Sequence, residues 1–406
     1  MAKIMSAVTT VGTTTDSAGG TLYVAQRKQF QALGFFWVFY CDGTNIVYST
    51  SPDGVNWSVG GSSPVRACLN AWMFGVWWDG THLHYAFSDG SAANNPILYR
   101  MGTPNSDGSI TWAAAEQTVL AGGGASVYYY NVVIRTDSSG FPWIGYADYN
   151  NSTFQWFAAV IASSTNNGTW TTAGGFPFTI GTPATNGTEA DAILVPLTNQ
   201  KMYAVFSQSG QSYASPGHPL QGMLYNAGWG TTETISTSNM NAGAPLSLSV
   251  VAQSDDVHLV FLKDVTNDII YVKRTFSSST WSSEVIVQAN TTSDGGPTLT
   301  KYTASNVLVC FWLKSPTLNH VYYKRNINGV WEPNFTDWKN ESNETLFGGN
   351  FLGCEYQDTK GVVGVVWTGI TVSPYDIRFS KLTLTQTMVP AGDGLTSFVY
   401  QIVTSS

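Results

Sequence analysis

The chain has few charged residues and no cluster of basic ones. Only 11% of its 406 residues are charged, and 18 lysines and arginines against 26 acids give a formal net charge of −8. No basic run is longer than a pair, as at Arg27-Lys28, Lys273-Arg274 and Lys324-Arg325. Because such a surface cannot neutralise many phosphates, we expect neither nucleic acid nor insertion into a membrane.

Other common sequence signals are also lacking. No apolar run approaches the length of a membrane-spanning helix, and the opening MAKIMSAVTT has no apolar segment typical of a secretory signal. The four cysteines, at 41, 68, 310 and 354, lack CxxC spacing, which argues against a zinc site. Cys310 lies in an apolar run and is predicted to be buried, whereas the sequence does not decide whether Cys41 and Cys68 form a disulfide.

What the chain does contain indicates an all-β fold. Aromatic residues reach 14%, there are 40 glycines, and Ser, Thr and Asn are abundant. Short runs of alternating apolar residues are separated by Gly, Asn, Asp and Ser, as expected for many strands joined by tight polar turns. Helices would instead need more Ala, Leu, Glu and Lys.

A repeated phrase, a polar turn followed by tryptophan, divides the chain into units. It occurs as SPDGVNW, NSDGSITW, TNNGTW, NAGW, SSSTW and NINGVW, and the tryptophans stand at 57, 112, 170, 229, 281 and 331. Successive markers are therefore 50 to 59 residues apart, a period typical of β-propeller blades. We place the turn between the third and outermost strands, with the indole packed between neighbouring blades.

We predict a single propeller, most simply of seven four-stranded blades, with six as the alternative. The predicted segments are an N-terminal arm (1–19), blades at about 20–66, 70–121, 126–176, 187–236, 245–289, 297–340 and 348–384, and a C-terminal tail (385–406). The seventh unit lacks an obvious fourth strand. Either SAVTTVG near the start or SFVYQIV near the end could complete it and remove an exposed sheet edge, and the tail could alternatively be a docking segment.

The phrase SPDGVNW resembles the Asp-box of the sialidase-like β-propellers, whose pattern is Ser-x-Asp-x-Gly-x-x-Trp. Here one residue is missing between Asp53 and Gly54, and the other copies are more degenerate. The resemblance implies the propeller architecture over most of the chain. It does not imply an activity, because the same motif occurs in enzymes, lectins and structural proteins.

The residues of a sialidase active site are not recognisable. The resemblance would require an arginine triad, a tyrosine nucleophile with a glutamate, and an acid/base aspartate, yet the Arg-Ile-Pro opening is absent and only seven arginines exist. No Gly-x-Ser-x-Gly elbow or phosphate-binding loop is present. We therefore assign no catalytic residue and no cofactor. With 26 acids in the chain, a pair of carboxylates as used by other glycoside hydrolases is left open.

His82 and His84 in THLHYAF fall on one face of a predicted strand, as a metal-binding pair would require. Two histidines without a third ligand do not make a site, and packing against aromatic neighbours on the strands explains them more simply. We assign no metal site to the sequence.

Ligand contacts are predicted on the loops between second and third strands. Acids and aromatic residues recur there, and they can hydrogen-bond sugar hydroxyls and stack on sugar rings. The competing explanation is that each aspartate only begins a turn. The predicted ligand-binding residues are Asp42, Asp89, Asp148, Tyr149, Tyr213, His218 and Asp264.

The composition, with little lysine and many aromatic residues, favours an extracellular-facing protein although no signal sequence is visible. The leading hypothesis is a noncatalytic recognition or structural propeller on a virion, as a tail, fibre or capsid-surface protein. It would bind a glycan or cell-surface receptor, and other structural subunits through its termini. The alternatives are a secreted or cell-surface lectin or filament subunit, and a divergent sialidase-like glycoside hydrolase.

Overall fold

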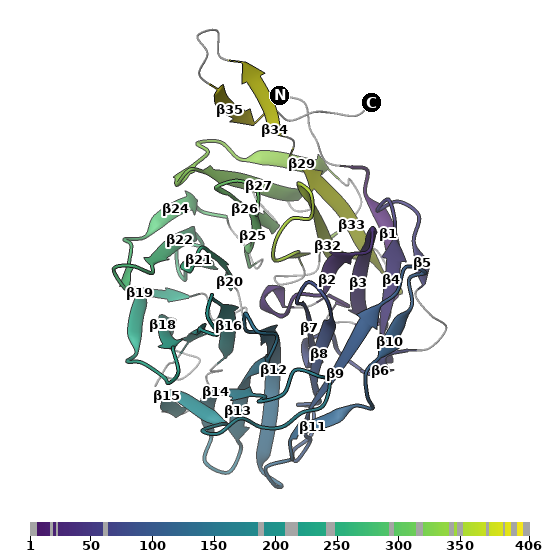
Figure 1. The fold of residues 1–406 in the computed structure, drawn as a ribbon, viewed down its shortest axis with the longest axis vertical. Helices are drawn as coiled ribbons and strands as arrows, with labels where there is room; N and C mark the ends of the chain where they lie inside the picture. The colour runs from purple at the N-terminus through teal and green to yellow at the C-terminus, as the bar shows by residue number, and fades with distance from the viewer. Residues whose placement is uncertain are drawn as a thin grey trace.

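Seven antiparallel sheets surround a central axis in the computed structural model, so the protein is a seven-bladed β-propeller (Figure 1). This confirms the predicted fold class and blade number. The structure describes residues 6–16, 19–21, 23–59, 64–185, 191–207, 218–240, 248–291, 296–313, 320–340, 345–346, 352–370, 373–384, 386–390 and 396–400. Within these residues no helix is long and apolar enough to cross a membrane.

The first four blades follow one another along the chain, each from its inner to its outer strand. Blade 1 has β2 (Gln29–Ala32), β3 (Phe35–Cys41), β4 (Asn45–Ser51), β5 (Ser58–Val59) and β6 (Arg66–Ala67). Blade 2 has β7 (Phe74–Trp78), β8 (Leu83–Ser88), β9 (Ile97–Pro104), β10 (Ile110–Trp112) and β11 (Gln117–Leu120). Blade 3 has β12 (Val127–Thr136), β13 (Pro142–Asn150), β14 (Gln155–Ala162) and β15 (Phe178–Thr185). Blade 4 has β16 (Ala192–Pro196), β17 (Met202–Ser207), β18 (His218–Tyr225) and β19 (Glu233–Met240).

The last three blades keep the same plan, except that blade 7 draws on both ends of the chain. Blade 5 has β20 (Leu248–Gln253), β21 (Asp256–Leu262), β22 (Ile269–Thr275), β23 (Thr280–Trp281) and β24 (Val285–Gln288). Blade 6 has β25 (Thr298–Tyr302), β26 (Val307–Leu313), β27 (His320–Ile327), β28 (Val330–Trp331) and β29 (Thr336–Asn340). Blade 7 has β30 (Thr345–Leu346), β31 (Gly353–Cys354), β32 (Val362–Ile370), β33 (Tyr375–Thr383) and β1 (Thr9–Thr14).

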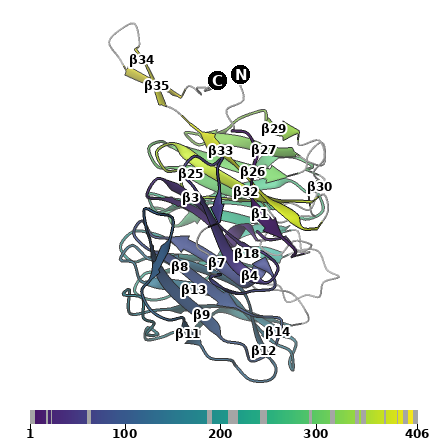
Figure 2. The same cartoon turned by 90° about the vertical axis from the view of Figure 1, so that its right-hand side faces the viewer.

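The N-terminal strand closes the ring. β1 pairs antiparallel with β33, from Thr9 opposite Phe379 to Thr14 opposite Tyr375, and so covers the outer edge of blade 7. Of the two closing strands left open by the sequence, the structure uses the one at the start. The other contributes to a separate two-stranded sheet of β34 (Gln386–Pro390) and β35 (Thr396–Tyr400), which projects beyond the rim of the disc (Figure 2).

The core consists of the faces between adjacent blades. The second strand of each blade is covered by a neighbouring sheet on both sides, so it is apolar without alternation, and every residue of β26 (VLVCFWL) is buried. Cys310 lies in this strand and is buried, as predicted. Cys41 and Cys68 are free buried thiols, so the disulfide left open by the sequence is not present.

The Asp-box turn links third and outer strands, as predicted. Asp53 Oδ1 accepts hydrogen bonds from the amides of Val55 and Asn56, both 2.8 Å away, and Ser51 Oγ accepts one from Gly54 N. The Asn56 and Val55 amides hold the pKa of Asp53 below its ordinary value. The motif thus stabilises its own turn.

Five of the six repeated indoles pack against the preceding blade, whereas Trp112 contacts Tyr85 of its own blade. Trp57 lies 4.9 Å from the Phe379 ring of blade 7 and donates to Thr9 Oγ1, and Trp281 lies 5.9 Å from the Tyr203 ring of blade 4. Three further indoles do the same, namely Trp170 on Tyr99, Trp229 on Phe178 and Trp331 on Tyr271. The repeat therefore specifies contacts between blades.

A segment between β1 and β2 enters the central channel. It contains the 3₁₀ turn η1 (Val24–Gln26), and a second such turn, η2 (Ala71–Met73), precedes β7. Gln26 Nε2 donates to Trp72 O and Val132 O, and the carbonyl of Ala25 accepts from Arg135 Nη2 at 2.8 Å. Residues 23–28 thereby contact several inner strands and fill the channel from one end.

Candidate functional site

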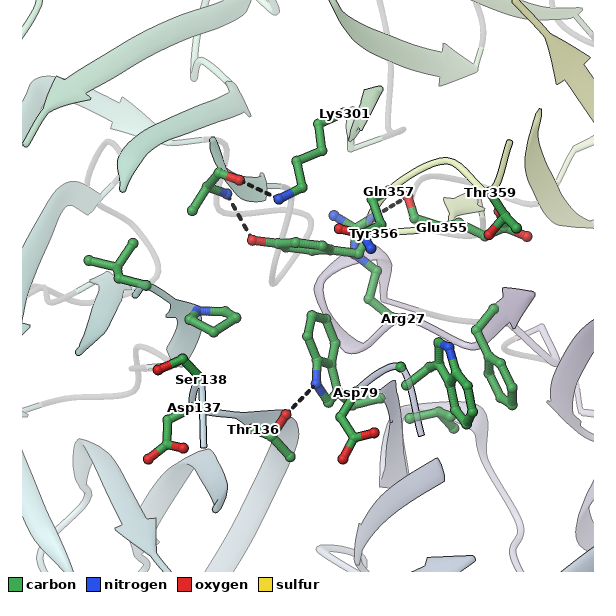
Figure 3. A pocket seen from close by; sticks show the side chains of 18 of the residues that line it. Arg27, Asp79, Thr136, Asp137, Ser138, Lys301, Glu355, Tyr356, Gln357 and Thr359 are labelled. Carbon is green, nitrogen blue, oxygen red and sulfur yellow. Dashed lines mark hydrogen bonds between the residues drawn. The ribbon is translucent and has the colours of Figure 1, made fainter. Parts of the chain in front are cut away.

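A cavity of about 460 Å³ lies at the end of the channel where the inner strands finish (Figure 3). The turns that join first to second strands surround it, and the Asp-box turns lie at this same end, which we call the Asp-box end. The opposite, crossover end carries the 2–3 loops and the connections between blades. All seven blades contribute lining residues, and the volume suits a small-molecule ligand.

Blade 7 supplies the floor because its inner segment β31 ends at Cys354. After Cys354 the chain leaves the sheet and runs beside the end of β25, where the amide of Lys301 bonds to Tyr356 O and the amide of Asp358 to Lys301 O. Tyr356 then crosses the channel, and its hydroxyl accepts a hydrogen bond from Ala252 N of blade 5 at 2.8 Å. Its ring lies 5.0 Å from that of Trp77 in blade 2.

Two stacked rings form part of the wall. Trp78, the last residue of β7, is partly exposed and stacks on Phe30 of blade 1, with centroids 5.2 Å apart and planes at 10°. Phe30 in turn stacks on buried Trp37 at 5.7 Å. The Trp78 indole is therefore held from behind by a rigid apolar support.

Asp79 follows Trp78 and is held in the ionised form. Its carboxylate accepts hydrogen bonds from the amides of Thr81 and His82 and contacts His84 Nε2 at 3.0 Å. Burial alone would raise the pKa of Asp79, but the His84 bond and the turn amides outweigh it, so this pKa lies below its ordinary value. His84 Nδ1 also hydrogen-bonds Tyr99 Oη at 2.9 Å, so both ring nitrogens of His84 have partners.

Two other acids at the cavity also accept hydrogen bonds from neighbouring residues. Asp255 Oδ2 accepts from Lys201 Nζ at 2.8 Å, and the Thr198 amide donates to Asp255 Oδ1. Asp137 Oδ1 accepts from the Ser139 amide at 2.8 Å and so stabilises the β12–β13 turn. These carboxylates hold turns and a neighbouring blade in place.

Glu355 differs from Asp79 and Asp255 because no cation in the described part of the chain pairs with its carboxyl. Its side chain is 2% exposed, Oε2 accepts a hydrogen bond from Gln31 Nε2 at 2.6 Å, and Oε1 has no partner. Burial raises the pKa of Glu355 to about 8, so the carboxyl is mostly protonated at neutral pH. A Cβ on Gly364 would lie 2.9 Å from Oε1, so glycine at that position makes room for the carboxyl.

Four of the seven arginines make ion pairs within or between blades and do not converge on the cavity. Arg274 binds Glu233 with two hydrogen bonds of 2.7 Å, and the other pairs are Arg66–Glu116, Arg325–Glu332 and Arg378–Asp376. Arg27 is the one arginine that lines the cavity. The described residues thus hold no arginine triad in the cavity.

The sequence-predicted ligand residues that the structure describes lie at the crossover end, and none lines this cavity. Asp42 and Asp89 accept hydrogen bonds within their own turns, from Asn45 N and Ser91 N respectively, and Asp264 lies in the β21–β22 turn. His218 begins β18 opposite Met240. Tyr213 lies outside the described residues.

Asp148 and Tyr149 are adjacent at the crossover end of β13. Burial raises the pKa of Asp148 to about 6, and the Tyr149 ring stacks on Trp156 at 4.4 Å. Tyr128 and Tyr130 lie within 6.5 Å of Tyr149, forming an aromatic group there. A role of these residues in ligand binding stays a prediction.

Sequence reasoning missed the residues of the Asp-box end. Trp78 and Asp79 (in WWDG) and Glu355 and Tyr356 (in CEYQD) were interpreted only as parts of strands and turns. One signal was available, since the first predicted strand of the seventh unit, FLGCEYQ, contains a glutamate.

No protein-family model and no curated protein sequence matches the chain. Among solved structures, the polysaccharide lyase Uly1 aligns over 91% of this chain and 90% of its own, with TM-score 0.54 and 8% identity. A protein of unknown function from Dyadobacter fermentans aligns over 93% and 99%, with TM-score 0.50 and 11% identity. Trypanosoma rangeli sialidase aligns over 76% and 54%, with TM-score 0.45 and 10% identity. At these identities the likeness is one of fold.

Proposed function

We propose that the protein recognises carbohydrate in the cavity at the Asp-box end. The observation that carries this proposal is the partly exposed Trp78 indole, which stacks on Phe30 and lines the same cavity as Asp79 and Gln31. A sugar ring has an apolar face that can lie on an indole and hydroxyl groups that bond to carboxylates and amides. A concave site with aromatic walls and a few fixed polar groups suits such a ligand.

Recognition without catalysis is the form of this function that the site favours. Asp79, Asp137 and Asp255 each accept hydrogen bonds that stabilise their own surroundings. Four arginines outside the channel, at 66, 274, 325 and 378, pair with acids of the blades, as a structural role requires. The likeness to a polysaccharide lyase supports the architecture and does not supply a catalytic set.

The test is binding of the purified protein to an array of neutral and acidic glycans, followed by calorimetry on each hit. Trp78→Ala should weaken binding about tenfold or more, because removing a large central ring costs on the order of 1.5–2 kcal/mol. Phe154→Ala is the matched control, since this aromatic side chain is 58% exposed and absent from the cavity.

The same ligands decide which end of the propeller binds. If Trp78→Ala leaves affinity unchanged while Asp148→Asn and Tyr149→Ala abolish it, the site lies at the crossover end and the proposed cavity is not the binding site. If neither set of variants alters binding, both locations are wrong.

A second candidate function is cleavage of a glycosidic bond, and one observation favours it. Glu355 and Asp79 line the same cavity, and their environments push their pKa values apart, to about 8 for Glu355 and below the ordinary value for Asp79. Such a split is how a site separates a proton donor from a carboxylate base or nucleophile. Turnover of an aryl-glycoside or sialoside panel, abolished by Glu355→Gln, would establish this activity; binding of the same sugars without turnover would exclude it.

We further propose that the protein is displayed on a surface, as a virion component or as a cell-surface lectin or filament subunit. The low lysine content and the abundance of aromatic residues support this setting. Intact-mass and peptide mapping of the protein from purified particles and from cell envelopes tests it. Recovery only from the soluble cell interior would contradict both forms of display.

A further inference from the structure

Two guanidinium groups are buried beneath the cavity without a carboxylate partner in the described part of the chain. Arg27 is 4% exposed, and its Nη atoms donate to Cys354 O, Leu299 O and Ser249 Oγ. Arg135 is 1% exposed and donates to the carbonyls of Ile134 and Ala25. Within the described residues, the Nε atoms of both arginines have no hydrogen-bond partner. Carbonyl dipoles therefore solvate the two positive charges, and no described carboxylate offsets them.

A third cation, Lys301, borders the cavity directly. It is partly exposed, and its Nζ donates to Ala252 O at 2.7 Å and lies 5.1 Å from the centre of the Tyr356 ring. Among the ion pairs of the described residues, none includes Lys301. An ammonium has three donors, so Lys301 keeps donors for a ligand above the aromatic floor.

The acids of the cavity do not supply the missing negative charge. Asp255 is paired with Lys201, Asp79 accepts from His84 and two amides, and Asp137 accepts within its turn. Glu355 is mostly neutral at pH 7 because burial raises its pKa to about 8. The side of the cavity formed by blades 6 and 7 therefore presents positive charge to open space.

We propose that the saccharide bound in this cavity carries an anionic group, a carboxylate or a sulfate, and that Lys301 binds this group above the ring of Tyr356. This inference rests on the proposed carbohydrate function and names the class of sugar. An ammonium that is partly desolvated forms its strongest hydrogen bonds with anionic oxygens. The protein has a net charge of −8, so a polyanion would be repelled overall, and its binding would require such a local cation.

The test compares probes that differ only in charge. Polygalacturonate is set against its fully methyl-esterified form, and dextran sulfate against dextran, with the full-length protein at low and at physiological salt. The acidic member of at least one pair should bind about tenfold more tightly than its neutral partner. A preference for polygalacturonate identifies a carboxylate ligand, and a preference for dextran sulfate identifies a sulfate.

Two lysine variants locate the contact. Lys301→Met keeps the apolar stem and removes the ammonium, so it should remove the preference for the acidic probe. Lys360→Met is the matched control, because Lys360 is exposed on the β31–β32 connection at the same end of the molecule and does not line the cavity. Affinity of Lys360→Met should stay within about twofold of the wild type.

The outcomes separate this inference from the function on which it rests. Equal loss in the two variants would mean that binding follows general surface charge, and the inference would be overturned. Binding of a neutral glycan that Trp78→Ala abolishes and Lys301→Met leaves intact would overturn the inference while the carbohydrate function stands. Failure of every probe and every arrayed glycan to bind would overturn both.

Discussion

Glu355 should make the propeller less stable as the pH rises, and replacing it should remove that dependence. The side chain is 2% exposed, Oε2 accepts a hydrogen bond from Gln31, and Oε1 has no hydrogen-bond partner among the described residues. The substitution Glu355→Gln keeps the shape and the acceptor for Gln31 and removes the ionisable proton. It therefore tests the charge of this group more than its packing.

The sign and size follow from the two pKa values. In the unfolded chain the carboxyl titrates near 4.5, whereas burial raises the pKa in the folded protein to about 8. Below pH 4.5 the carboxyl is protonated in both states, so Glu355 does not oppose folding. Between pH 4.5 and 8 the unfolded state has released the proton that the folded state retains, so the free energy of unfolding falls as the pH rises. A window of about 3.5 units corresponds to roughly 5 kcal/mol, at about 1.4 kcal/mol per unit.

The assay is urea denaturation at several pH values between 4.5 and 9. Glu355→Gln and the wild type should unfold with similar free energies at pH 4.5, and the variant should be several kcal/mol more stable at pH 8. Asp264→Asn, which removes a partly exposed carboxylate from the β21–β22 turn, controls for the loss of a charge. Parallel curves for the wild type and Glu355→Gln over the whole range would refute the reasoning.

Two further predictions concern the ring itself. Arg274→Met should lower the free energy of unfolding in urea by about 3 kcal/mol, because it leaves Glu233 beside Tyr203 and Trp281 without its cation. The double variant Arg274→Met with Glu233→Gln should recover part of that loss. Equal losses in the single and double variants would contradict a pairing role. Deletion of residues 1–14 uncovers the outer edge of β33, so it should lower Tm and produce oligomers in size-exclusion chromatography. A monomer with unchanged Tm would show that β1 is not needed for closure.

The sequence was sufficient for the fold because the propeller is built from local signals that repeat. Each turn followed by tryptophan is specified by a few adjacent residues, such as Ser51, Asp53 and Gly54, and five of the six repeated indoles contact an aromatic ring of the preceding blade. A period of 50 to 59 residues therefore indicated a propeller, with seven blades as the leading prediction and six as the alternative. The closing strand could not be chosen, because both termini have strand-like sequences and only the β1–β33 register separates them.

The candidate site was not predictable in the same way, because it depends on contacts between distant parts of the chain. Arg27 meets Ser249, Leu299 and Cys354, which are more than 200 residues away in sequence. The predicted acids of the 2–3 loops show the opposite difficulty, because their local sequence signal is clear but has a structural cause. Asp42 and Asp89 recur because they stabilise turns, and a repeated aspartate reports a turn whether or not a ligand binds there.

A departure from the repeat builds the cavity at the Asp-box end. Six blades have inner strands of four to ten residues, whereas the described inner edge of blade 7 is formed by two short strands, β30 and β31, of two residues each. The residues that follow Cys354 are consequently free to leave the sheet, and they place Glu355 in the wall and Tyr356 across the channel. Residues 23–28 fill the channel from the crossover side, so this opening faces the Asp-box turns. In a ring of similar blades, the blade with the irregular inner strand is therefore the one that contributes side chains to the cavity that the repeat does not specify.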